Sequence, residues 1–342
     1  MHLVERDIAI DLGTTSTLLY VRGKGVAMRE PTVVAVDKIT GKLLKIGSEA
    51  EKMLGRTPAN IVAIHPISNG VISDYDMTTR MLQELISRVT SYSFFKPCVI
   101  VCVPNSITGV EERAIIDATI EAGARKVYLL ETAVATSTGA GIDISKPDGH
   151  MIVDIGGGTT EVAVVSLGGV VECESIKTAG DEFDEAIVKY IRRKHSVLIG
   201  MRTAEELKRS IGCAFPRSEV GSMEVKGRCL LTGLPKSVTV SSSDMIEALE
   251  EPLETILETI HMVLERTPPE LVADISVNGI VMSGGGSLIW GLDKLITSRT
   301  GIEASVVDDP LACAAYGAGK MLKELDNMQE GMINLARRKQ MK

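Results

Sequence analysis

Two segments of this chain resemble each other. The first is residues 8–17, with the sequence IAIDLGTTST, and the second is residues 152–161, with the sequence IVDIGGGTTE. In both, an apolar run leads into Asp, and Gly and hydroxyl residues follow, before a second apolar stretch at residues 18–21 or 162–165. This pattern predicts a strand, a tight turn and a second strand in each place. We therefore expect the chain to contain two similar halves.

The residue types in these segments are typical of a phosphate-binding turn. Gly lets backbone N–H groups approach an anion closely, and successive N–H groups in a turn form a concave site for phosphate oxygens. Asp11 and Asp154 would repel a nucleotide directly, so they indicate a hydrated Mg²⁺ between the carboxylates and the phosphates. Two ordinary β-turns that carry Asp and Gly are the alternative, and the match between the segments disfavours it.

Length and composition indicate a globular protein with more than one domain. The chain has 342 residues, of which 44% are hydrophobic and 24% are charged. Its net charge of −8 disfavours nucleic acid as a partner, because nucleic-acid binding needs a basic face. The six cysteines and five histidines show no metal-ligand or catalytic spacing. Without a bilayer-spanning apolar run or a signal-peptide stretch, a cytoplasmic location is expected.

Strand-like and helical segments alternate along both halves, which predicts parallel strands joined by helical crossovers. The apolar strand runs are residues 99–103, 126–130, 279–283 and 306–307. The helical patterns are residues 78–89, 108–122, 133–140, 181–194, 204–212 and 244–264, the last with Asp244 as its expected N-cap. Residues 130–136 and 306–315 also resemble each other, which is a second indication of duplication.

The motifs of this chain resemble those of the actin and heat-shock-chaperone ATPase superfamily, which also contains sugar kinases. Within it they are most similar to the MreB family, the bacterial actins that direct rod shape. The matching motifs are residues 11–14, 30–35, 70–75, 154–162, 179–185, 202–205, 232–235, 267–271 and 284–288. The Asp-x-Gly-Thr motif alone would be weak evidence, whereas the full set covers nearly the whole chain in the family's order.

The resemblance implies an α/β fold of the duplicated actin-like ATPase type. The two halves of this fold are ribonuclease H-like, and each of the two domains has a large and a small subdomain. The implied first domain is residues 1–145, with a small-subdomain insertion at about 32–75, and the second is residues 146–310, with an insertion at about 182–243. Residues 311–342 would return to the first domain as a C-terminal helix.

The resemblance also assigns site residues at the matching positions. The implied ligands of the ATP phosphates are Thr14, Thr15, Ser16, Gly157, Gly158 and Thr159. Asp11 and Asp154 would orient waters around Mg²⁺ in the cleft that holds ATP. The residues implied for ribose and adenine are Glu205, Glu206, Leu207, Lys208, Gly284, Gly285, Gly286 and Ser287. Without the resemblance, a solvated helix face is the favoured interpretation of residues 205–208.

One catalytic position departs from the family pattern. The family has Glu-Glu-Pro before the small-residue helix, and its second Glu positions the attacking water, whereas this chain has Glu131, Thr132 and Ala133. Thr cannot accept a proton as a carboxylate does, and loss of such a group commonly lowers a rate by ~10² to 10⁴. With Asp154 beside Mg²⁺, we expect ATP to be bound and hydrolysed slowly, unless Glu131 or another acid substitutes.

Residues 93–97, with the sequence SFFKP, contain half of the chain's four Phe residues. Phe94 and Phe95 are expected at a loop tip that enters a bilayer interface, where the family has its membrane-touching loop. Packing of both rings into the core is the alternative. Weak anchors act together along a polymer through avidity. The resemblance therefore implies homopolymer filaments on the inner face of the cytoplasmic membrane, with cell-wall elongation machinery and membrane-anchored shape proteins as further partners.

Two other functions belong to the same fold class. A small-molecule kinase would need a catalytic Asp in a substrate pocket, and the sequence contains no dedicated motif for it. A chaperone-type ATPase would need a C-terminal peptide-binding domain, and none is expected after the last helix. The favoured function is therefore an ATP-binding, membrane-associated filament protein that organises cell-wall synthesis in a rod-shaped bacterium.

Overall fold

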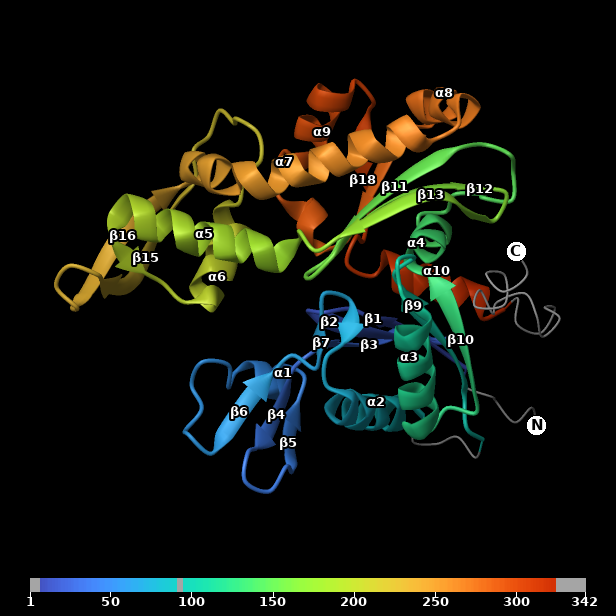
Figure 1. Ribbon diagram of the computed structural model, residues 1–342, viewed down its shortest axis with the longest axis horizontal. Coiled ribbons are helices and arrows are strands. Elements are labelled where there is room, and N and C mark those ends of the chain that lie inside the picture. Colours follow the sequence, from blue (N-terminus) through green and yellow to red (C-terminus); the bar gives the residue numbers. More distant parts are fainter. Residues whose placement is uncertain (1–6, 91–94, 324–342) are drawn as a thin grey trace. The chain divides into compact units, whose positions relative to one another are not determined.

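The computed structural model describes residues 7–90 and 95–323, and the chain divides into two compact units (Figure 1). The residues of unit 1 lie within Met1–Pro147, Val165–Val170 and Leu311–Lys342, and those of unit 2 lie within Asp148–Val164 and Val171–Pro310. The chain therefore returns to unit 1 after it has completed unit 2.

The first five-stranded sheet has the strand order β10-β9-β1-β2-β3. Its strands are β1 (Ile8–Leu12), β2 (Ser16–Val21), β3 (Gly25–Pro31), β9 (Cys98–Val103) and β10 (Lys126–Glu131). β1 pairs antiparallel with β2 and parallel with β9, and β9 pairs parallel with β10. The hairpin and the parallel crossovers expected from the sequence are therefore both present.

Helices cover both faces of this sheet (Figure 1). The helices of unit 1 are α1 (Ser48–Glu51), α2 (Tyr75–Thr90), α3 (Gly109–Glu121), α4 (Thr132–Gly139) and α10 (Cys313–Met321). Ile8 and Ile10 of β1 share a core with α2 and α3, whereas Ala9 shares a core with α4 and α10. Because successive strand residues point to opposite faces, an uninterrupted apolar run serves both cores.

The second five-stranded sheet has the same arrangement, which in the corresponding direction reads β18-β17-β11-β12-β13. Its strands are β11 (His150–Ile155), β12 (Thr160–Ser166), β13 (Gly169–Ile176), β17 (Ile280–Ser283) and β18 (Ala304–Val306). Asp11 lies opposite Cys102 in the β1–β9 pair, and Asp154 lies opposite Ser283 in the β11–β17 pair. The two carboxylates thus occupy equivalent positions, and the predicted duplication is confirmed.

The helices of unit 2 share one hydrophobic core with Met151, Val153 and Ile155 of β11. They are α5 (Gly180–His195), α6 (Met201–Ile211), α7 (Ser242–Arg266), α8 (Pro269–Asn278) and α9 (Leu292–Thr300), with a 3₁₀ helix η1 at Gly285–Leu288. The sequence pattern did not indicate α8, because Ile275 is its one buried residue and no apolar stripe marks the helix.

The predicted N-cap of α7 is wrong. The cap is Ser241, whose hydroxyl accepts a hydrogen bond from the Asp244 N–H at 3.2 Å. Asp244 completes a capping box, because its Oδ2 accepts the Ser241 N–H at 2.7 Å. Burial raises the pKa of Asp244, but hydrogen bonds from Lys194, Ser241 and Tyr190 outweigh burial and hold the pKa well below its ordinary value.

Smaller sheets lie within the segments 32–75 and 182–243 for which insertions were expected. The first is β5-β4-β6, made of Leu43–Ile46, Val34–Asp37 and Ile61–Ile64, and beside it in the sequence is the hairpin β7-β8, Ile67–Ser68 and Val71–Ile72. The second is β14-β15-β16, made of Val197–Leu198, Ser222–Cys229 and Pro235–Ser241. Both small sheets are antiparallel.

The small-residue helices α4 and α10 pack against each other within unit 1. A Cβ atom on Gly317 would lie 1.8 Å from the carbonyl oxygen of Ala135, and one on Gly139 would lie 2.0 Å from the carbonyl oxygen of Cys313. Non-bonded atoms do not approach so closely, so glycine is required where the two backbones touch. α4 follows β10 and α10 follows β18, and these strands hold equivalent places in their sheets.

The Gly317→Ala variant is expected to lower the free energy of unfolding by about 1–3 kcal/mol, because an added methyl group forces α4 and α10 apart. Thermal unfolding followed by circular dichroism measures the change. Gly109→Ala is the matched control, since no atom lies within 4 Å of its added methyl group. Equal melting temperatures for the two variants would contradict the role assigned to Gly317.

Candidate functional site

Unit 1 contributes a tight turn between β1 and β2. The Gly13 N–H donates to the Ser16 carbonyl at 3.1 Å and closes the turn, and a Cβ atom on Gly13 would lie 2.9 Å from that carbonyl oxygen. Behind the turn, the buried Thr32 donates its hydroxyl to the Gly13 carbonyl at 2.8 Å. Its N–H donates to the Thr15 carbonyl at 2.9 Å. Thr32 therefore holds the turn from one side.

These contacts also set the direction of the amide groups in the turn. In a trans peptide, the N–H points opposite to the carbonyl of the preceding residue, and no described peptide bond is cis. Since the carbonyls of Gly13 and Thr15 face Thr32, the N–H groups of Thr14 and Ser16 face away from it. Amide groups directed to one side of a glycine turn form an anion site.

The Thr14 side chain is fixed by a residue that is distant in the sequence. Its Oγ1 accepts a hydrogen bond from the Gly70 N–H of the β7–β8 hairpin at 2.9 Å, and the residue is only 8% exposed. Asn69 and Gly70 both have positive φ angles, 50° and 74°, as the two central residues of a type I′ hairpin turn do. The Thr14 hydroxyl keeps its own proton for donation. Thr15, by contrast, is exposed.

Unit 2 contributes a turn of the same construction between β11 and β12. The Gly156 N–H donates to the Thr159 carbonyl at 2.9 Å, and a Cβ atom on Gly156 would lie 3.2 Å from that oxygen. The next residue, Thr160, is buried and donates its hydroxyl to the Thr178 carbonyl at 2.7 Å. In unit 1 the equivalent Thr17 hydroxyl lies 2.9 Å from that of Thr32. The two turns are thus similar in geometry as well as in sequence.

In the second turn, the first residues of α5 take the place of Thr32. The Gly180 N–H donates to the Gly156 carbonyl at 3.1 Å, and the Asp181 N–H donates to the Gly157 carbonyl at 2.8 Å. By the same trans-peptide geometry, the N–H groups of Gly157 and Gly158 face away from α5. These two N–H groups at the start of α5 have no partner within the helix. The contact therefore satisfies the helix donors and fixes the carbonyls of the turn.

One carboxylate precedes each turn at the end of its strand. Asp11 lies in β1 and Asp154 lies in β11, and both are half-buried. Within the described residues, no group of three His, Cys, Asp or Glu side chains is arranged to hold a metal ion directly. A cation that keeps its waters and is shared with phosphate oxygens needs only one or two carboxylates. The residues present therefore fit Mg²⁺ that arrives with a phosphate ligand.

The residues expected to contact ribose and adenine on α6 have different environments. Leu207 is fully buried in the core of unit 2, so its side chain serves packing. Glu205 forms an ion pair with Arg209 at 3.8 Å, and Glu206 forms one with Arg202 at 3.4 Å. Both ion pairs lie at the solvent-exposed side of the helix, where such pairs contribute little to stability.

Lys208 on the same helix is held inside unit 2. Its Nζ donates to the Gly180 carbonyl at 2.8 Å and to Asp184 Oδ2 at 2.7 Å. Burial raises the pKa of Asp184 to about 6, and the Lys208 ammonium opposes part of that rise. Asp184 could not be assigned a role from the sequence alone, because its partner lies on another helix, 24 residues away.

The glycine-rich turn after β17 packs against the end of β11. A Cβ atom on Gly284 would lie 2.3 Å from the carbonyl oxygen of Ile155 and 2.8 Å from Asp154 Oδ1. One on Gly286 would lie 2.3 Å from Ile155 Cγ2. The Ser287 hydroxyl donates back to the Gly284 carbonyl at 2.7 Å. Packing on β11 therefore requires glycine at these positions, independently of any base that binds there.

Glu131 and Thr132 lie where β10 meets α4. Glu131 is the last residue of β10 and the N-cap of α4, and Thr132 is the first helical residue. Both side chains are half-buried. The departure from the family pattern thus falls at the start of a helix whose remaining residues are mostly buried.

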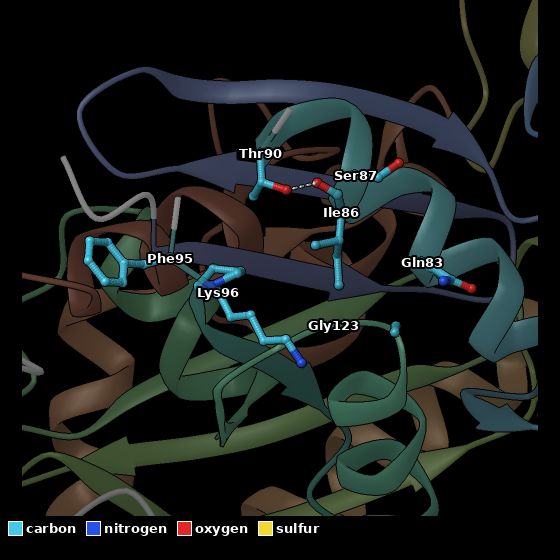
Figure 2. Close-up of a pocket in the computed structure, with 9 residues that line it drawn as sticks. Gln83, Ile86, Ser87, Thr90, Phe95, Lys96 and Gly123 are labelled. Carbon is cyan, nitrogen blue, oxygen red and sulfur yellow. Dashed lines mark hydrogen bonds between the residues drawn. The ribbon is translucent and has the colours of Figure 1, made fainter. Parts of the chain in front are cut away.

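Phe95 lies at a pocket of about 290 Å³ on unit 1, and Phe94 lies outside the described residues (Figure 2). Phe95 is 51% exposed, so its ring is not packed wholly into the core. Thr90 and Ile86 of α2 also line the pocket, and the Thr90 hydroxyl donates to the Ile86 carbonyl within the helix at 2.7 Å. None of the helices in the described part of the chain combines the length and the apolar character needed to cross a membrane.

Two sheets with the same strand order, each with a glycine turn and a carboxylate at the same place, define an actin-like fold. The sequence model of the family described as "MreB/Mbl protein" matches residues 5–330. The chain belongs to this MreB/Mbl family. The resemblance inferred from the motifs is thereby confirmed.

Relatives cover nearly the full chain. "Cell shape-determining protein MreB" of Escherichia coli (strain K12) is 48% identical over 330 residues, which cover 95% of this chain and 95% of that protein. "Cell shape-determining protein Mbl" of Bacillus cereus is 46% identical and covers 94% of this chain and 97% of that protein. The crystal structure of MreB5 of Spiroplasma citri bound to ADP has a TM-score of 0.92 and 36% identity, and covers 96% of this chain and 99% of that one.

Proposed function

We propose that this chain is an actin-like cytoskeletal protein that binds ATP, polymerises into filaments and directs cell shape. The observation that carries the proposal is the matched pair of turns, 13–16 and 156–159, each with its amide groups directed to one side. Crystals of the Spiroplasma citri relative contain ADP or AMPPNP, which supports an adenine nucleotide as the ligand. The names of the Escherichia coli and Bacillus cereus relatives support the role in cell shape.

Within this proposal, the phosphates are contacted by the backbone N–H groups of Thr14, Ser16, Gly157 and Gly158, with hydroxyl donation from the threonines of the turns. Mg²⁺ would neutralise phosphate charge, and Asp11 and Asp154 would accept hydrogen bonds from its waters. The residues at 205–208 and 284–287 remain the proposed contacts of ribose and adenine. A ligand that binds one conformation better than another shifts the population toward it, so the nucleotide would control polymerisation.

The filament would lie on the inner face of the cytoplasmic membrane, with cell-wall elongation machinery and membrane-anchored shape proteins as its partners. The exposure of Phe95 supports this location, because an aromatic side chain at a loop can enter the bilayer interface. One anchor per chain binds weakly, whereas many anchors along a filament act together.

The purified chain is expected to sediment with ATP and Mg²⁺ and to form filaments visible by electron microscopy.

Gly13→Ala is expected to weaken ATP binding at least about tenfold, because the added methyl group displaces the turn. Gly169→Ala is the control, since its methyl group meets no atom within 4 Å. Absence of sedimentation, together with phosphorylation of a sugar from a panel, would instead identify a small-molecule kinase.

Thr132→Glu is expected to raise the rate of phosphate release from ATP by about 10² or more, because it restores a carboxylate at the water-positioning place. Thr132→Gln is the control, since it has the same size and no proton-accepting carboxylate. Equal rates for the unmodified chain and the Thr132→Glu variant would show that this position does not limit hydrolysis.

The double variant Phe94→Ser with Phe95→Ser is expected to abolish co-sedimentation of filaments with liposomes, because both apolar anchors are lost. Sedimentation without liposomes should stay unchanged. Ile39→Ser removes an apolar side chain that is 83% exposed elsewhere on unit 1 and serves as the control. Undiminished liposome binding by the double variant would refute the anchor.

A further inference from the structure

Asp184 is a buried carboxylate to which none of the roles above applies. The residue is 6% exposed, and its Oδ2 lies 2.7 Å from Lys208 Nζ. Its Oδ1 is buried with no hydrogen-bond partner in the described part of the chain. Buried carboxylate oxygens are normally satisfied, so an unsatisfied one calls for an explanation in terms of function.

Asp184 is connected to the turn of unit 2 through Lys208. The Lys208 ammonium also donates to the Gly180 carbonyl at 2.8 Å. The Gly180 N–H in turn donates to the Gly156 carbonyl, and a Cβ atom on Gly180 would lie 3.3 Å from Gly157 Cα and 3.4 Å from Lys208 Nζ. The ammonium group and Gly157 therefore border the same space beside Gly180, close to the turn whose amides are proposed to bind the anion.

The ammonium of Lys208 has three N–H donors, and two of them are used by Gly180 and Asp184. The two fixed bonds determine where the third N–H points. A lysine has a flexible four-carbon chain, so an ammonium with a single remaining partner would lose this orientation. The other charged groups that face Asp184 are Glu205 of α6 and Asp181 of its own helix, both negative, so neither can replace Lys208 as its partner.

We propose that Asp184 is a positioning residue for the nucleotide: its carboxylate fixes the Lys208 ammonium against Gly180, and the third N–H is thereby presented to the bound ligand. The inference rests on the proposed binding of ATP and adds a pH-dependent control to it. When Asp184 takes up a proton, Lys208 loses its charged partner and the nucleotide is bound less tightly.

The direction of the pH effect follows from the environment of Asp184. Burial raises its pKa to about 6, so the carboxylate is charged above that pH and neutral below it. ATP affinity is therefore expected to be high near pH 7.5 and to fall as the pH is lowered through 6. If net charge mattered more than the orientation of Lys208, loss of the negative charge on Asp184 would instead raise the affinity for the anionic nucleotide as the pH is lowered. The experiment below distinguishes these two pH trends.

Mg²⁺–ATP affinity of the full chain is measured by calorimetry or by the fluorescence of Trp290, the sole tryptophan. Asp184→Asn is expected to weaken binding about tenfold at pH 7.5, as loss of one hydrogen bond between charged groups does. Glu185→Gln is the matched control, because it removes the same charge from the next residue of α5, whose carboxylate pairs with Lys189 in solvent at 3.4 Å. Its affinity should stay within about twofold of the unmodified chain.

A double-mutant cycle tests whether Asp184 acts through Lys208. In a Lys208→Met chain, Asp184→Asn should change affinity less than about twofold, because the group that it positions is absent. This double variant also removes both charges of the pair, which avoids an unpaired buried ammonium if Asp184→Asn alone folds poorly. Additive losses would overturn the inference.

The pH series from 5.5 to 8 gives a readout that a purely structural role would not change. The terminal phosphate of ATP itself titrates near pH 6, so the informative quantity is the ratio of the affinities of the unmodified chain and Asp184→Asn at each pH. The ratio should fall toward one at low pH. Equal or tighter binding by Asp184→Asn at pH 7.5 overturns the inference alone, whereas absence of ATP binding by the unmodified chain overturns the proposed function and the inference with it.

Discussion

The carbonyl groups of the two glycine turns are hydrogen-bonded from behind, and the rest of the site depends on this. Because a trans peptide is rigid, a carbonyl held on one side directs the following N–H to the other. The two units achieve this with different donors. In unit 1 both donors belong to Thr32, whereas in unit 2 they are the N–H groups of Gly180 and Asp181 at the start of α5. A duplicated strand–turn–strand element thus keeps its amide directions although its support has diverged.

The use of a helix start as the support has consequences for the whole of unit 2. α5 contacts the turn at its first residues, binds α6 through Asp184 and Lys208 one turn later, and reaches α7 at its far end through Tyr190 and Asp244. The Tyr190 hydroxyl, protonated at neutral pH as any tyrosine hydroxyl is, donates to Asp244 at 3.0 Å, and burial raises its pKa further to about 12. Displacement of the turn would therefore move a helix that is bonded to both of its neighbours.

The duplication, the parallel crossovers and the turns could be predicted because each depends on residues close together in the sequence. Apolar runs, Asp and Gly at fixed spacing identify a strand and its turn without knowledge of the rest of the fold. The contact of Gly70 with Thr14 could not be predicted in this way, because 56 residues separate the two and nothing in either local pattern shows that they come together. The same holds for the pairing of Asp184 with Lys208. Asp244 was assigned the wrong role because Ser241 and Asp244 both belong to residue types that favour caps.

Glycine in the matched motifs has two separate physical causes, which a sequence pattern does not distinguish. Gly284 and Gly286 leave room for Ile155, as Gly317 leaves room for the backbone of α4, and these positions would need glycine without any ligand. Gly13 and Gly156 instead close the two turns and carry the carbonyls that are held from behind. The structural case for a phosphate site therefore comes from the direction of the amides in two turns rather than from the number of glycines. An apolar core alone does not require those amides to face away from Thr32 and α5, and this direction is what the proposed phosphate contacts would use.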